Sequence, residues 1–167
     1  MKNDKGVTLT MLVIIIIVLF IITGISVDTG VEFMNDVRVS RIVANMELVQ
    51  AKVEIIYEEY QFQGENSEID VLVGQKVNGN DIFRKISDDK TISENDRKLF
   101  ENDNNLWYQW NASVLEEQGL DKNMLDDPEN DVFWVNYATS EIIYSRGTVI
   151  DDITYFSKDA LEAVLAR

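Results

Sequence analysis

The residues from Val7 to Val27 form an unbroken stretch without a charged side chain, and this stretch limits the fold more than any other feature. Lipid hydrocarbon about 30 Å thick is crossed by roughly 20 apolar residues that each rise 1.5 Å in a helix. A cleaved secretory signal has a shorter apolar core of about 7 to 15 residues. We therefore expect a membrane-spanning helix over residues 7–27, in contact with lipid.

Two lysines set the expected orientation of this helix. Lys2 and Lys5 precede the apolar stretch, and Asp28 is the first charged residue after it. Because lysine and arginine next to a membrane helix stay on the cytoplasmic side, the amino terminus should be cytoplasmic. The chain should then be a single-pass protein of the cell membrane, with everything after Asp28 outside the cytoplasm.

Composition limits the chemistry of the exported part. The chain has 30 acidic and 15 basic residues, a net charge of −15, and neither cysteine nor histidine. The negative charge disfavours binding to nucleic acid. Without cysteine and histidine there are no disulfides, thiol nucleophiles, imidazole bases or usual zinc ligands. We assign no catalytic residue and expect no enzyme activity.

Beyond the apolar stretch, a second helix signal extends to about residue 62. Apolar residues recur there at spacings of three and four, which places them on one helix face. We expect residues 28–62 to continue the first helix outside the membrane, with this face packed on the protein's own sheet. A coiled coil with a partner is the alternative. The stripe consists of Val39, Ile42, Met46, Val49, Val53, Ile56 and Tyr60.

Residues 63–167 are expected to form one small domain that combines helices with an antiparallel sheet, which makes the fold class α+β. Alternating or β-branched runs predict strands at residues 69–73, 82–86, 106–110, 132–137, 141–145 and 153–156. Ser113 and Glu116 predict a capped short helix that ends at Gly119. Ser157 is the expected cap of a last helix that runs through Leu165.

The segment 121–131 gathers acidic and amide side chains, the ligand types that a hard cation prefers. It is not an EF-hand, because the required glycine is missing. A solvated acidic loop is the commoner explanation, and calcium is the alternative; we expect no other cofactor. The candidate ligands are Asp121, Asn123, Asp126, Asp127, Glu129 and Asp131.

The start of the chain also resembles a known processing signal. Lys5-Gly6 followed by Val7 and a uniform apolar helix resembles the class III signal of type IV pilins and type II secretion pseudopilins. The run Val-Asn-Tyr-Ala-Thr-Ser-Glu-Ile-Ile-Tyr at residues 135–144 looks like the globular domain of pilin-like proteins from Gram-positive bacteria. The resemblance implies that a prepilin peptidase removes a leader of residues 1–6 and that the mature chain starts, usually methylated, at Val7.

One position departs from the family pattern. Most pilins carry a glutamate five residues into the mature chain, where it pairs with the amine of a neighbouring subunit, and here that position is Met11. Thr10 beside it carries no charge and cannot replace that glutamate. The departure suits a minor subunit at a filament tip, or a Gram-positive subgroup that lacks the glutamate.

The resemblance implies a pilin-like fold, with a long amino-terminal helix packed on a small antiparallel sheet. It implies a structural subunit of a type IV pilus-like or type II secretion-like filament at the cell surface. The expected partners are other pilin-like subunits, the prepilin peptidase and the assembly machinery. The alternative function is a monomeric membrane-anchored protein whose acidic extracellular domain binds a ligand.

Overall fold

The computed structural model describes residues 15–16, 36–62, 72–88, 91–100 and 106–166. The chain divides into two units, Met1–Arg38 and Val39–Arg167. Apart from the helical Ile15 and Ile16, the expected membrane helix at 7–27 lies outside the described residues. None of the helices within the described ranges has the length and apolar character needed to cross a membrane.

The unit Val39–Arg167 is α+β, as the sequence predicts. A long helix covers the described residues 36–62, which confirms the helix predicted for this stretch. The elements that follow are β1 (Gln75–Val77), α2 (Gly79–Ser87), α3 (Glu94–Lys98), β2 (Trp107–Trp110), α4 (Ala112–Glu117), the 3-10 helix η1 (Lys122–Met124), β3 (Phe133–Asn136), β4 (Ile142–Ile150), β5 (Ile153–Ser157) and α5 (Lys158–Leu165).

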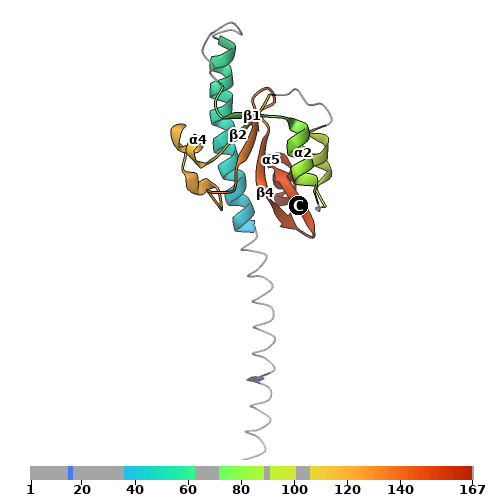
Figure 1. The fold of residues 1–167 in the computed structure, drawn as a ribbon. Helices are drawn as coiled ribbons and strands as arrows, with labels where there is room; N and C mark the ends of the chain where they lie inside the picture. The colour runs from blue at the N-terminus through green and yellow to red at the C-terminus, as the bar shows by residue number, and fades with distance from the viewer. Residues whose placement is uncertain (1–14, 17–35, 63–71, 89–90, 101–105, 167) are drawn as a thin grey trace, which may run out of the picture. The chain divides into compact units, whose positions relative to one another are not determined.

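The five strands form one antiparallel sheet in which spatial order follows chain order, β1-β2-β3-β4-β5. Successive side chains in a strand point to opposite faces, so β2, β3, β4 and β5 supply core residues on both faces of the sheet. In β3, Phe133 and Val135 belong to one apolar cluster, whereas Trp134 between them belongs to another. The sheet therefore has an apolar cluster on each face, and Figure 1 shows the long helix on one side of the sheet and α2 on the other.

The long helix covers the first of these faces. Met46, Val49 and Val53 are fully buried and share a cluster with Trp110 and Phe133 from the sheet. This arrangement confirms that the predicted helix stripe packs on the protein's own sheet. Burial of such side chains stabilises the fold by about 1.5 to 3 kcal/mol each.

Helix α2 covers the other face, and here the predicted strand at 82–86 is wrong. Ile82 and Ile86 are four residues apart, so both fall on one side of a helix, and both are buried against Trp107 and Trp134. Asn78 caps the helix by accepting a hydrogen bond from the backbone N–H of Asn80 at 2.8 Å.

The buried carboxylate of Asp96 joins α3 to the end of the sheet. It accepts hydrogen bonds from the Ser93 hydroxyl at 2.6 Å and from the backbone N–H groups of Phe156 at 3.0 Å and Ser157 at 2.8 Å. These three donors satisfy a carboxylate that is 1% exposed and would otherwise be costly to bury.

Other local predictions have mixed outcomes. Strands β2, β3, β4 and β5 confirm the predictions at 106–110, 132–137, 141–145 and 153–156, and α5 with its Ser157 cap confirms the last helix. Helix α4 exists, but its cap is Asn111 and not Ser113, whose hydroxyl donates to Asn111 Oδ1 at 2.8 Å. Within the predicted strand 69–73, residues 69–71 lie outside the described residues, and Leu72 and Val73 are not in a strand.

Candidate functional site

The predicted processing and assembly residues lie outside the described residues. They are Lys5, Gly6, Val7, Thr10 and Met11. The described part of the chain offers two other features for a functional site, which are the acidic loop at 121–131 and the outer surface of the long helix.

Asp131 is the centre of the acidic loop. Its Oδ2 atom accepts hydrogen bonds from the Tyr144 hydroxyl at 2.7 Å, Arg146 Nε at 2.8 Å and the backbone N–H of Asp127 at 2.9 Å. The hydroxyl of Tyr144 in turn accepts the backbone N–H of Asp126 at 2.9 Å. Through these bonds, Asp131 and the Tyr144 hydroxyl connect the segment 126–131 to β4 at both ends of that segment.

The pKa values of three side chains in this arrangement are shifted by their neighbours. Burial raises the pKa of Tyr144 above its ordinary value, so its hydroxyl keeps the proton that it donates to Asp131. The hydrogen bond to Asp131 raises the pKa of Arg146. The hydrogen bond from Asn130 lowers the pKa of Asp127, which keeps that carboxylate charged.

The same loop is attached to the long helix. Asp126 forms an ion pair with Arg41, and Asn45 donates a hydrogen bond to the backbone oxygen of Met124 at 3.1 Å. Met124 and Leu125 are buried in the cluster that the helix and sheet share. The loop thus connects the long helix to β4 through hydrogen bonds, an ion pair and buried side chains, and we call this connection the clasp.

The candidate calcium ligands are directed to protein donors. Asp121 caps η1 by accepting the backbone N–H of Asn123 at 2.8 Å, while Asp126, Asp127 and Asp131 bond to the partners given above. Glu129 is exposed. In the described part of the chain, which includes the whole loop, no three carboxylates converge into a group that could hold a metal ion. The loop is an internally bonded segment in which Asp121, Asp126, Asp127 and Asp131 already have protein donors, and calcium binding to it stays a prediction.

The long helix carries a second apolar stripe, which the sequence reading missed. Leu48, Ile55 and Phe62 are 56%, 59% and 93% exposed, although the helix buries seven other apolar residues. Positions seven apart fall within about 20° of one another on a helix. Ala44 and Ala51, also exposed, lie on the same surface. We call Leu48, Ile55 and Phe62 the outward stripe; their regular seven-residue spacing was the available signal.

The outward stripe has the composition of a contact surface. Spacings of four and three residues connect Ala44, Leu48, Ala51 and Ile55, which is the narrow seam that one helix offers to another. Single exposed apolar residues need no explanation, whereas large contiguous apolar surfaces mark interaction sites, so the outward stripe is a candidate for such a site. Comparisons with family models, curated proteins and solved structures find no match to this chain.

Proposed function

We propose that this chain is a structural subunit of a type IV pilus-like or type II secretion-like filament, anchored in the membrane by residues 7–27 and processed after Gly6. The observation that carries the proposal is Lys5-Gly6 placed directly before the charge-free stretch from Val7 to Val27. A cut on that side of the stretch leaves the apolar helix attached to the mature protein. The helix can then serve first as an anchor and later as an assembly element.

The folded unit supports this role. The long helix buries one apolar stripe on its own sheet and exposes the outward stripe. It can therefore pack on its own domain and contact a neighbouring subunit at the same time. In the proposed filament, a neighbouring pilin-like subunit covers the outward stripe. The acidic remainder of the surface stays in water, where its charge limits unspecific association.

Met11 is the basis for proposing a particular kind of subunit. An unpaired carboxylate at the centre of a bilayer costs about 3 kcal/mol or more, and in pilins the neighbour's amine offsets that cost. Met11 neither incurs the cost nor forms the pair. We therefore propose a minor or tip subunit that assembles with a glutamate-bearing partner and does not form long filaments by itself.

Photo-crosslinking tests the proposed neighbour. The chain has no cysteine, so Ile55→Cys creates a single thiol to which a benzophenone maleimide can be attached in cells that contain the assembly machinery. We expect crosslinks to another pilin-like subunit. Glu54→Cys, an exposed position about 100° around the helix, is the matched control and should crosslink much less.

The alternative function predicts a different result. A monomeric anchored protein would give no subunit crosslink from Ile55→Cys under conditions where a co-expressed pilin assembles. Crosslinks of equal yield from both positions would indicate unspecific proximity and would count against the outward stripe as the contact. The substitution Met11→Glu separates the two functions again, since incorporation should be tolerated in a filament and insertion should weaken in a lone anchor.

A further inference from the structure

The outward stripe lies on the side of the long helix that faces away from the sheet. Leu48 and Ile55 are separated by about 20° around the helix axis. The buried residues Val49 and Val53 lie about 100° or more from Leu48 around the same axis. The chain's own domain therefore leaves the outward stripe uncovered, and a second helix has access to it.

A pocket of 370 Å³ borders the stripe at Leu48. The long helix supplies one wall of this pocket, and the connection from α4 to η1 supplies the other with Gly119, Leu120 and Met124. A Cβ added at Gly119 would meet no atom within 4 Å beyond its chain neighbours, which indicates open space on that side of the backbone. An apolar side chain of a second helix can therefore enter beside Leu48, as a knob enters a hole in paired helices.

The other end of the stripe is flanked by carboxylates. Glu58 and Glu59 lie about 50° to either side of the line from Ile55 to Phe62. Both glutamates are exposed, and within the described part of the chain Glu58 forms no ion pair. Lys52, the nearest basic residue of the helix, precedes Glu58 by about 9 Å along the axis. This end of the stripe therefore presents negative charge on both sides of an apolar line.

A second copy of this chain does not match the stripe in register. Subunits anchored in one membrane by the same end present their long helices in the same direction, so equal positions of two in-register copies would meet. Ile55 would then contact Ile55 of the other copy, but Glu58 and Glu59 of both copies would gather at one end of the contact. Like charges placed across an interface select against that pairing.

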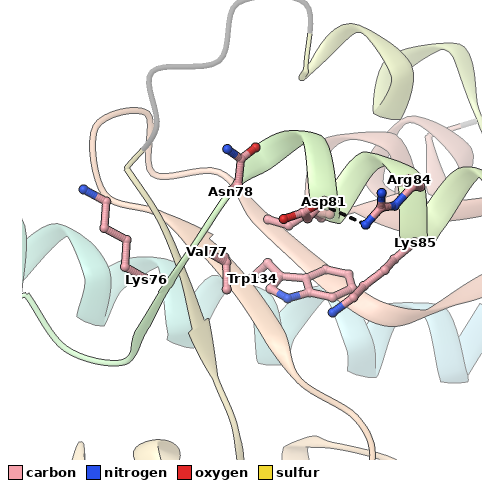
Figure 2. Close-up of a pocket in the computed structure, with 8 residues that line it drawn as sticks. Lys76, Val77, Asn78, Asp81, Arg84, Lys85 and Trp134 are labelled. Atoms are coloured by element: carbon pink, nitrogen blue, oxygen red, sulfur yellow. Dashed lines mark hydrogen bonds and ion pairs between the residues drawn. The ribbon is translucent and has the colours of Figure 1, made fainter.

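Helix α2 of a second copy does not match the stripe either. It is the only α-helix in the described part of the chain whose basic residues, Arg84 and Lys85, outnumber its acidic residue, Asp81. Figure 2 shows Arg84 directed to Asp81, at 3.1 Å, and Lys85 beside the ring of Trp134, with Nζ 5.8 Å from the ring centre. The apolar side of α2 is buried against the sheet. An apolar line with basic flanks must therefore come from a different protein.

The charges beside the seam of two paired helices determine which partner is accepted. We propose that the outward stripe binds a parallel helix of a different subunit, and that this helix carries lysine or arginine beside its apolar line, opposite Glu58 and Glu59. The identity of that subunit as pilin-like rests on the proposed function, whereas the binding surface rests on residues 48–62. The two glutamates then reject an in-register copy of this chain and attract the basic partner.

A charge-reversed copy of the chain is the probe for this surface. Glu58→Lys combined with Glu59→Lys keeps the apolar line and makes its flanks basic. Energy transfer between dyes on Asp152→Cys, an exposed turn position outside the long helix, measures association of full-length chains in a maltoside detergent. The pair of unreversed chain and probe should bind about tenfold more tightly than either chain binds itself, because several exposed opposite-charge pairs replace like-charge pairs. The apolar stretch 7–27 is the same in all these chains and contributes equally to each pair.

Two variants separate the stripe from general charge attraction. Glu116→Lys combined with Glu117→Lys reverses two adjacent exposed glutamates of α4, and a probe with this change should gain no more than about twofold. Ile55→Ser in both members of the mixed pair should remove the tenfold gain, because the apolar contact is lost. All the altered side chains are exposed, so circular dichroism spectra should match those of the unaltered chain.

Three results would overturn the proposal. The first is a mixed pair that binds no more tightly than the unreversed chain binds itself, which would assign the stripe to a second copy or to no partner. The second is an equal gain with the α4 probe, which would indicate general charge attraction, and the third is a gain that survives Ile55→Ser. None of these measurements depends on cleavage after Gly6, so failure of the partner proposal and failure of the proposed function are distinguishable.

Discussion

Replacing Asp131 with alanine tests how the acidic loop is held, and its cost follows from the donors that lose their acceptor. The hydroxyl of Tyr144 sits in a residue that is 1% exposed, so its unsatisfied proton costs about 1 to 3 kcal/mol. The N–H of Asp127 is partly buried and adds up to about 1 kcal/mol. Arg146, whose side chain is 41% exposed, regains water and adds little. The sum is about 3 kcal/mol of unfolding free energy.

Urea unfolding of residues 28–167, followed by tryptophan fluorescence, measures this cost. Glu129→Ala is the matched control, because it removes a carboxylate from the same loop at an exposed position and should cost less than about 0.5 kcal/mol. The double variant Asp131→Ala with Tyr144→Phe lacks the hydroxyl that needs Asp131. Its loss of unfolding free energy should therefore be smaller than the sum of the losses in the two single variants. Equal costs for Asp131→Ala and Glu129→Ala would refute the account of the clasp.

Three further predictions concern the same folded unit. Glu141→Gln should raise stability at neutral pH by up to about 1 kcal/mol. Burial and then the charge of Asp159 raise the pKa of Glu141, so ionisation of this side chain costs the folded state more as the pH rises above 4.5, the ordinary pKa of a glutamate. The gain over the unaltered protein should vanish when unfolding is measured below that pH. Gly147→Ala should destabilise the domain by about 2 kcal/mol or more in the same urea assay. Gly147 has φ +67°, and an added Cβ would lie 2.7 Å from Phe156 Cε1. Gly119→Ala is the control for the backbone part of that cost, because Gly119 has φ +76° and open space around the added Cβ. Calcium at about 1 mM should leave the melting temperature unchanged, because the loop carboxylates are directed to protein donors, whereas a rise absent with magnesium would show a calcium site.

Elements set by neighbouring residues were predictable from the sequence. The last helix follows from the Ser157 cap, and the β3–β4 hairpin follows from two aromatic and β-branched runs separated by a short polar turn. The long helix follows from one strongly periodic stripe. In each of these cases the local preference agrees with the final packing, which is why the pattern is sufficient.

Elements that depend on distant contacts were not predictable in this way. Ile82, Phe83 and Ile86 suit a short strand or a short helix equally well, and the buried face that Trp107 and Trp134 offer decides for the helix. The carboxylate of Asp96 finds its donors 60 and 61 residues away. In the acidic loop, composition gave the candidate ligands, but only the fold places Tyr144 and Arg146 where they satisfy Asp131.

The most direct test of the filament-subunit account is the intact mass of the chain after co-expression with an active prepilin peptidase. The account predicts loss of residues 1–6, leaving a mature chain that starts at Val7, with or without one added methyl group. Gly6→Leu, which places a bulky side chain at the cut, should abolish the shortening while membrane insertion is retained. A full-length chain alongside a co-expressed pilin that is cut normally, or a cut beyond Val27, would contradict the account.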